Sequence, residues 1–267
     1  MTLFAFSTLN HSTLFGEGTT IADQIVAAAR AGFPLLSPDF FSVRTYRKDG
    51  GTLAELAELQ HTHGIRSYDV AGLTVSDDDE ATKREAEELA EIGAALGAEW
   101  MQVRVTEPID EAVRDRYAWC RDACARAGLG VAVEFSPFTP IRTISDAQDV
   151  LATRGGEGAR GGVIVDSFHV CRGATTWEEL DALPLDELAF VQFDDALPPG
   201  DDGRADTMHR RALPGEGDLD LARFAAGLRK RGFDGVVSVE VLAAHDRGGP
   251  VESFARRCRE SSEPYWR

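Results

Sequence analysis

The chain has 267 residues, of which 43% are hydrophobic, and its formal net charge is −17 at pH 7. This length suits one (β/α)8 barrel with a sizeable core, whereas so acidic a balance argues against nucleic-acid binding, which needs clustered Lys and Arg. The N-terminus shows no secretory signal and no apolar run is long enough to span a bilayer, so we expect a cytoplasmic protein without a membrane partner.

Strand-like and helix-like segments alternate along the chain. Apolar β-type runs predict strands at residues 3–9, 34–39, 65–75, 100–105, 129–135, 163–168, 189–193 and 236–242. Helical periodicity and end signals predict helices at residues 19–32, 52–64, 76–97, 110–128, 144–154, 176–183, 219–232 and 251–259. Ser76 is expected to cap the clearest of these helices.

Regular alternation of this kind indicates a parallel sheet, and eight βα units favour a closed barrel over an open doubly wound sheet. The first strand is not followed by GxGxxG, which counts against a dinucleotide-binding fold. We therefore predict an α/β protein in which residues 1–267 form a single TIM-barrel domain.

One connection is unusually long. Residues 194–218, about 25 in number, join the seventh strand to its helix, and structureless connections of this length are usually lids or binding loops. The segment carries His209, Arg210 and Arg211 immediately before a Pro-Gly-Glu-Gly turn. We interpret it as a substrate-binding loop.

Four apolar runs each end near a side chain that can offer oxygen to a metal. These residues are Glu134, Asp166, Gln192 and Glu240, on the expected strands five to eight. Barrel enzymes carry their chemistry at the C-terminal ends of the strands, so the four side chains should meet at one mouth. Three carboxylates at close range need a compensating charge, which a divalent ion supplies. Oxygen-only ligands favour Mg2+ or Mn2+ over zinc.

These residues also have structural interpretations. A single acid at a strand end is usually a turn residue or helix cap, whereas four such ends on consecutive strands favour a common site. His169 is either a hydrogen-bonded structural residue or a general acid/base beside the metal. Arg210 and Arg211 are either solvated charges or ligands for a carboxylate or phosphate.

Five segments resemble the xylose isomerase-like barrel superfamily, and more closely its sugar phosphate isomerase/epimerase branch. They are VEF at 133–135, VDSFH at 165–169, VQFDDA at 191–196, HRRALPGEGDLDL at 209–221 and VSVEVL at 237–242. These motifs cover the second half of the chain, and the βα alternation extends the resemblance to all of it. The end of the second strand, LLSPD at 35–39, departs from the glutamate-bearing segment that is usual there.

The resemblance implies one divalent metal ion, Mn2+ or Mg2+, held by Glu134, Asp166, Gln192 and Glu240. It also implies that the two glutamates move protons on opposite faces of the substrate.

Three further residues are implied to bind the substrate. His169 would contact substrate oxygens and take part in catalysis, Arg211 would bind the substrate's far end, and His209 is expected to assist in binding.

The leading functional hypothesis is a metal-dependent isomerase or epimerase. It would act on a small polyhydroxy carbonyl compound (a sugar, a sugar phosphate or a keto-polyol) through an enediolate or enolate intermediate. The first alternative is a dehydratase of the 3-dehydroshikimate or keto-inositol type, because many members of the branch have His where this chain has Gln192, and 3-dehydroshikimate dehydratases also have Gln there. The second alternative is a non-catalytic sugar-binding barrel. A homodimer is compatible with all three.

Overall fold

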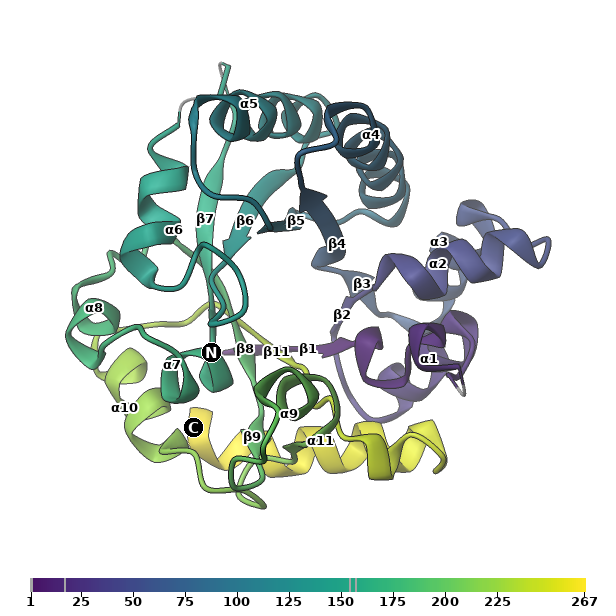
Figure 1. The fold of residues 1–267 in the computed structure, drawn as a ribbon. Coiled ribbons are helices and arrows are strands. Elements are labelled where there is room, and N and C mark those ends of the chain that lie inside the picture. The colour runs from purple at the N-terminus through teal and green to yellow at the C-terminus, as the bar shows by residue number, and fades with distance from the viewer. Residues whose placement is uncertain (1, 17, 154, 157) are drawn as a thin grey trace.

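Nine parallel strands form the centre of the structure, a computed structural model that describes residues 2–16, 18–153, 155–156 and 158–267. The strand order is β3-β2-β1-β11-β8-β7-β6-β5-β4. At the two ends of this order lie β3 (Arg66–Ser67) and β4 (Asp69–Val75), which are consecutive pieces of one chain segment. A bridge between Asp39 and Ala71 links the end of the second strand to β4, so the sheet is nearly closed. This confirms the predicted barrel (Figure 1).

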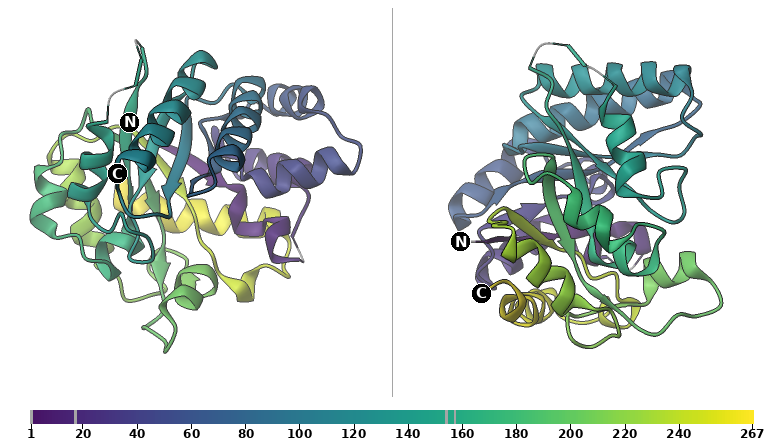
Figure 2. Two further views of the ribbon diagram at one scale, coloured as in Figure 1. Left: turned by 45° about the horizontal axis from the view of Figure 1, so that its top comes forward. Right: turned by 90° about the vertical axis from the view of Figure 1, so that its left-hand side faces the viewer.

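The other barrel strands are β1 (Leu3–Ser7), β2 (Leu35–Ser37), β5 (Trp100–Val105), β6 (Gly130–Glu134), β7 (Gly161–Asp166), β8 (Leu188–Phe193) and β11 (Val236–Val239). The helices, which lie around the outside of the sheet (Figures 1 and 2), are α1 (Ile21–Arg30), α2 (Phe40–Lys48), α3 (Leu53–His63), α4 (Asp79–Leu96), α5 (Glu111–Arg126), α6 (Ile144–Leu151), α7 (Ser167–Arg172), α8 (Trp177–Ala182), α9 (Gly203–His209), α10 (Leu221–Lys230) and α11 (Val251–Trp266).

Side chains inside the barrel form two layers, because successive residues of a strand face opposite sides of the sheet. The first layer is apolar and contains Ala5, Leu35, Tyr68, Ala132, Ile164, Phe190 and Val236. The second layer is polar and contains Ser7, Ser37, Gln102, Glu134, Asp166, Gln192 and Ser238, of which all but Gln102 lie two residues further along the same strand than a member of the first layer. Hydrogen bonds across the interior join strands that are not neighbours in the sheet, such as Ser37 with Ser238 at 2.9 Å. The polar layer therefore faces the C-terminal mouth of the barrel.

The helix ends follow local hydrogen bonding. The carboxylate of Asp78, not the hydroxyl of Ser76, caps α4, since it accepts a hydrogen bond of 2.9 Å from the backbone N–H of Ala81. Ser76 instead lies 3.3 Å from the hydroxyl of Thr82. Gly97 ends the same helix with a φ of +72°, a conformation that glycine adopts without steric cost. The prediction for Ser76 was therefore wrong by two residues.

Several segments differ from the sequence-based expectation. The sixth strand ends at Asp166 instead of residue 168, because α7 begins there. Helix α2 was not expected, and α11 extends to Trp266. The helix expected at residues 144–154 ends at Leu151, and residue 154 lies outside the described part of the chain.

The long connection is not structureless. It contains α9 and a two-stranded hairpin of β9 (Asp195–Ala196) and β10 (Arg211–Ala212), and α9 stands away from the strands in Figure 2.

Within the described residues, no helix combines the length and the apolar character that a membrane crossing requires.

Candidate metal and substrate site

Asp166 joins the end of β7 to the start of α7. Its Oδ1 atom accepts hydrogen bonds from the backbone N–H groups of Phe168 and His169, at 2.6 and 3.2 Å. The carboxylate is thus the N-cap of α7, the structural role that the sequence offered as the simpler interpretation. The cap also brings His169, on the first turn of the helix, back toward the strand end, and leaves Oδ2 of Asp166 facing the polar layer.

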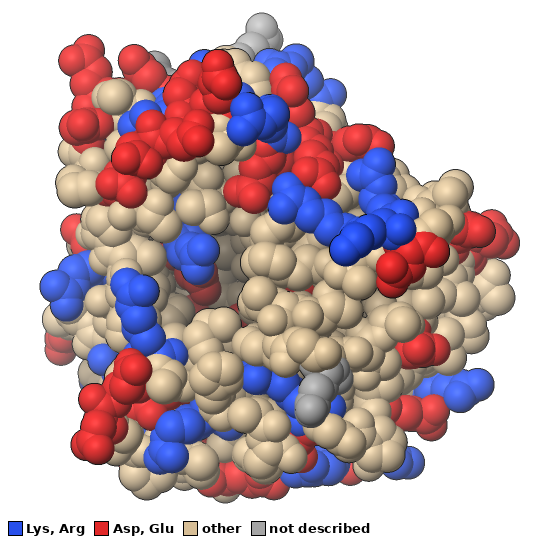
Figure 3. Space-filling view, turned by 45° about the vertical axis from the view of Figure 1, so that its right-hand side comes forward, with Lys and Arg blue, Asp and Glu red and all other residues tan. Residues whose placement is uncertain are grey.

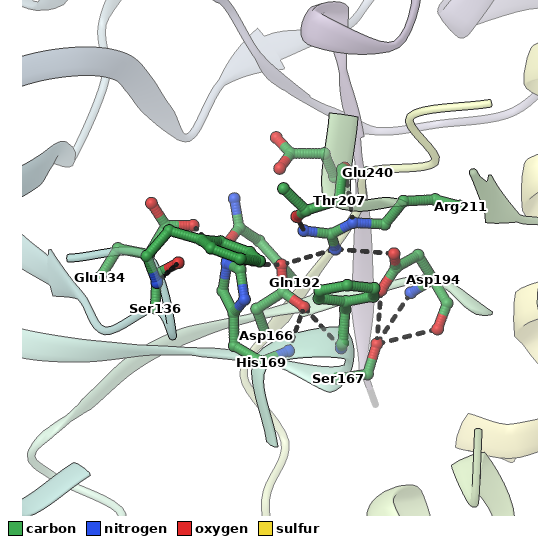
Figure 4. Close-up of polar contacts among 12 residues, drawn as sticks. Glu134, Ser136, Asp166, Ser167, His169, Gln192, Asp194, Thr207, Arg211 and Glu240 are labelled. Atoms are coloured by element: carbon green, nitrogen blue, oxygen red, sulfur yellow. Dashed lines mark hydrogen bonds and ion pairs between the residues drawn. The ribbon is translucent and has the colours of Figure 1, made fainter. Parts of the chain in front are cut away.

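Glu134, Asp166 and His169 form the group of potential metal ligands (Figure 4). One ligand atom of each lies within 4.8 Å of the others, and Nε2 of His169 lies 3.6 Å from Glu134 Oε1 and 3.8 Å from Asp166 Oδ2. These distances are too long for good hydrogen bonds. They are close to the roughly 3–3.5 Å that separates two ligand atoms bound to one ion at about 2.0–2.2 Å. The spacing therefore fits a cation between the three side chains.

Gln192 lies beside Asp166, because the two residues are register partners in the β7–β8 pair. The side chain is 1% exposed, and its Oε1 atom has no hydrogen-bond partner among the described residues. A buried carbonyl oxygen without a partner costs free energy unless another group satisfies it. Gln192 thus fits the predicted role of a metal ligand.

Glu240 follows β11 directly and faces the same cavity, but it is not part of the 4.8 Å cluster found in the described chain. Its Oε1 atom accepts a hydrogen bond of 2.9 Å from the hydroxyl of Ser7. Burial, together with the nearby charge of Glu134, raises the pKa of Glu240 to about 8. A carboxyl group of this kind can hold a proton near neutral pH.

Arg211 is 2% exposed and lies at the candidate metal site. Its Nη1 atom donates to Oδ2 of Asp166 at 2.8 Å and to Oδ2 of Asp194 at 2.7 Å. Its Nε and Nη2 atoms donate to the backbone carbonyl and the hydroxyl of Thr207, at 3.1 and 2.9 Å, and the guanidinium carbon lies 4.4 Å from the ring centre of Phe168. Arg211, which was expected to bind the far end of a substrate, thus contacts the candidate ligand Asp166 directly, and it also lines the cavity at this site.

The two acids that share this guanidinium differ in their titration. Burial opposes the charged form of Asp166, but Arg211 outweighs it, and the pKa of Asp166 is lowered. For Asp194, burial and the charge of Asp166 prevail over Arg211 and raise the pKa to about 7. Asp194 was not among the predicted site residues, although it directly follows a buried strand, which is the signal that identified the others.

Asp195 organises the rest of the long connection. Its carboxylate accepts hydrogen bonds of 3.0 Å from the backbone N–H groups of Gly215, Gly217 and Leu219. A side chain on Gly217 would collide with the carbonyl oxygen of Ala196. The Pro-Gly-Glu-Gly turn is therefore built around Asp195, and it holds Arg211 in position through the β9–β10 hairpin.

A cavity of about 490 Å3 opens at the candidate site. Its floor includes Glu134, His169, Arg211 and Glu240, and its walls include the aromatic residues Phe40, Phe41 and Phe138. The surface is hollowed on the face shown in Figure 3, with acidic and basic side chains nearby. Two exposed cations, Arg104 and Arg204, also line the cavity, and neither has an ion-pair partner within the described chain. The cavity can therefore receive a small polar molecule.

His209 and Arg210 lie outside this cavity. The side chain of His209 is exposed, and its Nδ1 atom lies 3.0 Å from Nη1 of Arg247. Arg210 pairs with Asp206, with 2.8 Å between Nε and Oδ1. The structure therefore does not bring His209, an expected substrate-binding residue, to the candidate site.

Two further buried polar residues near the site, one of which (Gln102) also lines the cavity, were not predicted from the sequence. Gln102 lies in the middle of β5 and Asp69 begins β4, and both are buried. Their side chains meet at 2.6 Å, and burial raises the pKa of Asp69 to about 6. These two residues could have been found in the sequence as polar residues within otherwise apolar strands.

A family profile described as Xylose isomerase-like TIM barrel matches residues 25–260. The inosose isomerase of Bacillus velezensis is 25% identical over 272 residues, which cover 93% of this chain and 95% of that enzyme. The 3-dehydroshikimate dehydratase of Pseudomonas putida is 33% identical over 94 residues, which cover 35% of this chain and 15% of that enzyme.

Solved structures show the same fold. A structure of the IolI protein with a zinc atom has a TM-score of 0.83 at 20% identity, covering 99% of this chain and 98% of its own. The probable 3-DHS dehydratase AsbF from Bacillus anthracis has a TM-score of 0.71 at 14% identity, covering 95% of this chain and 97% of its own. At these identities the likeness shows a shared barrel.

Proposed function

The chain belongs to the xylose isomerase-like TIM barrel family, and from this premise we propose that it is a metal-dependent isomerase of a small polyhydroxy carbonyl compound. The observation that carries the proposal is that Glu134 and Glu240 line one cavity together with His169. The inosose isomerase relative, which matches almost the whole chain, supports a keto-inositol as the substrate.

The ligands of the proposed ion are Glu134, Asp166, His169 and Gln192. When bound, a divalent ion supplies Lewis-acid polarisation of the carbonyl and hydroxyl oxygens of the substrate. His169 adds a nitrogen ligand to a set that the sequence indicated to consist of oxygen ligands only. Mn2+ suits such a mixed set better than Mg2+, and zinc, which imidazole also favours, becomes a competitor.

Glu134 and Glu240 supply the proton transfers. One carboxylate removes a proton from the hydroxyl-bearing carbon next to the carbonyl group, and the other gives a proton to the former carbonyl carbon. The hydroxyl proton moves to the former carbonyl oxygen, so the product has the composition of the substrate. The hydroxyl of Ser7, 2.9 Å from Glu240 Oε1, holds that carboxyl group in place. The aromatic residues that line the cavity would limit the access of water to the deprotonated substrate.

A second candidate is a dehydratase of the 3-dehydroshikimate type. Arg104 and Arg204 favour it, because two unpaired cations in a cavity suit a substrate with a carboxylate, which 3-dehydroshikimate has and a keto-inositol lacks. Gln192 is shared with such dehydratases. The same base would remove the proton. In this candidate His169 would not bind the metal but would protonate the leaving hydroxyl group, which departs as water.

Mass spectrometry of products separates the two candidates. The Mn2+-loaded protein would be incubated in D2O with a keto-inositol, ketohexoses and 3-dehydroshikimate. An isomerase gives a product of unchanged composition that has exchanged a carbon-bound hydrogen for deuterium, whereas a dehydratase loses one water. Loss of water from 3-dehydroshikimate alone would refute the isomerase, and ligand binding without either reaction would indicate a non-catalytic sugar-binding barrel.

A further inference from the structure

The orientation of the Gln192 amide decides whether this residue can bind a cation. The carbonyl oxygen and the NH2 group of a glutamine have nearly the same shape, but only the oxygen is a metal ligand. The buried amide therefore needs a neighbour that distinguishes its two ends. That neighbour is Gln102, whose Oε1 atom lies 3.4 Å from Nε2 of Gln192.

The amide of Gln102 is itself oriented by Asp69. The Nε2 atom of Gln102 donates to Oδ2 of Asp69 at 2.6 Å, and the hydroxyl of Ser37 donates to Oδ1 at 2.5 Å. An ionised carboxylate only accepts hydrogen bonds, so it selects the NH2 end of the neighbouring amide. The Oε1 end of Gln102 then has to point away from Asp69, toward Gln192.

This orientation passes to Gln192. If its amide were reversed, two carbonyl oxygens would face each other at about the 3.4 Å that now separates donor and acceptor, which is electrostatically unfavourable. With the NH2 group directed at Gln102, the Oε1 atom is left without a partner among the described residues, beside Asp166.

We propose that Asp69, acting through Gln102, is a positioning residue that turns the carbonyl oxygen of Gln192 toward the metal. The inference rests on the proposed metal site. It gives a reason for the buried acid on β4, which lies on the far side of the barrel interior from β8 and contacts no candidate ligand directly. Outer-shell partners of this type typically contribute about 10- to 100-fold to metal affinity.

Asp69→Asn tests the proposal without altering a ligand. An asparagine at this position can present either its oxygen or its NH2 group to Gln102, so the selection is lost. We expect Mn2+ to bind about 10-fold more weakly, as measured by the electron paramagnetic resonance signal of free Mn2+ during titration of chelator-treated protein.

A double-substitution cycle distinguishes positioning from a general structural effect. Gln192→Ala removes the amide that is to be oriented, so Asp69→Asn should cause no further loss of Mn2+ affinity in that background. If Asp69 acts only on the stability of the barrel, the loss will be the same in both backgrounds. Gln102→Met, which removes the connection but retains the volume, should weaken Mn2+ binding as Asp69→Asn does.

Circular dichroism and thermal unfolding establish that each variant is folded, and Gln102→Met provides the test if Asp69→Asn does not fold. Unchanged Mn2+ affinity in a folded variant would overturn the positioning role while leaving the metal site intact. Failure of the unmodified protein to bind Mn2+ would instead overturn the proposed function and, with it, the positioning role. The two failures are therefore distinguishable.

Discussion

Arg211 and Asp166 form a buried ion pair in which Nη1 lies 2.8 Å from Oδ2, and each side chain is at most 2% exposed. Through the same Nη1 atom, Arg211 also reaches Asp194. One cation thus neutralises a candidate metal ligand and, in addition, fastens the segment that carries α9 and β10 to the ends of β7 and β8. The candidate site and the long connection are therefore held together by the same buried ion pairs.

Arg211→Met should lower the free energy of unfolding by about 3–5 kcal/mol, because it leaves the buried carboxylates of Asp166 and Asp194 without a compensating charge. Urea unfolding followed by circular dichroism measures the loss. Limited proteolysis should also cut the variant faster within residues 203–209, since the segment is no longer held to the strand ends.

Arg210→Met is the matched control. The side chain of Arg210 is 44% exposed and pairs with Asp206, an arrangement that usually contributes less than about 1 kcal/mol. If both substitutions lower the free energy of unfolding equally, Arg211 does not hold the segment of α9 and β10 to the strand ends.

Glu240→Gln should stabilise the metal-free protein while abolishing turnover. Burial raises the pKa of this carboxyl from 4.5 to about 8, so between these values the folded state binds a proton that the unfolded chain has lost. The free energy of unfolding of the unmodified protein therefore falls as pH rises through this range. Glutamine cannot ionise, and we expect a gain of about 1–4 kcal/mol near pH 8.

The gain from Glu240→Gln should disappear near pH 4, where glutamate is largely protonated in both states. Denaturant unfolding near pH 8 and near pH 4 measures this change in the free energy of unfolding and shows whether the substitution stabilises the protein. A variant that is less stable near pH 8 would show that Glu240 is not a buried, destabilised charge, and full retention of activity would remove it from the proposed mechanism.

The sequence allowed the barrel and most of its floor to be predicted, for a simple geometric reason. Parallel strands place their C-terminal ends at one mouth, so the strand-end residues Glu134, Asp166 and Gln192 could be grouped without knowledge of the strand order. Side-chain alternation then required them to face inward. The site residues of the second half of the barrel were easier to predict, because each of its strands is apolar up to the polar residue at its end.

Other features depend on contacts that no local pattern reveals. Helix α7 starts directly after Asp166 because that side chain caps it, and this turn brings His169 into the cluster of candidate ligands. Asp69 and Gln102 meet between the neighbouring strands β4 and β5, although they are 33 positions apart in the chain. His209 and Arg211 were assigned together because they are neighbours in sequence, yet β10 directs only Arg211 inward.

Restoring a divalent ion should stabilise the chelator-treated protein. At about 100 times the dissociation constant, Mn2+ is expected to add about 2.7 kcal/mol, which corresponds to roughly 5–10 °C in Tm for a chain of this size. Glu134→Gln should remove most of this shift, whereas Glu178→Gln, a change on the exposed face of α8, should retain it. Differential scanning calorimetry with and without Mn2+ measures the effect, and an equal shift in both variants would exclude Glu134 as a ligand.

The two histidines offer a paired test of where the reaction takes place. His169 is 4% exposed and lies 3.6 Å from Glu134, whereas His209 is exposed and contacts Arg247. His169→Ala removes a ligand of the proposed ion, so it should weaken Mn2+ binding and reduce kcat/KM, each by more than the about 10- to 100-fold that is typical of outer-shell partners. His209→Ala should leave both within about 2-fold of the unmodified protein, because surface substitutions away from a site have small effects. Steady-state kinetics on the substrate found in the product screen, combined with Mn2+ titration, checks both; a large loss in His209→Ala would mean that the exposed end of α9 takes part in binding the substrate.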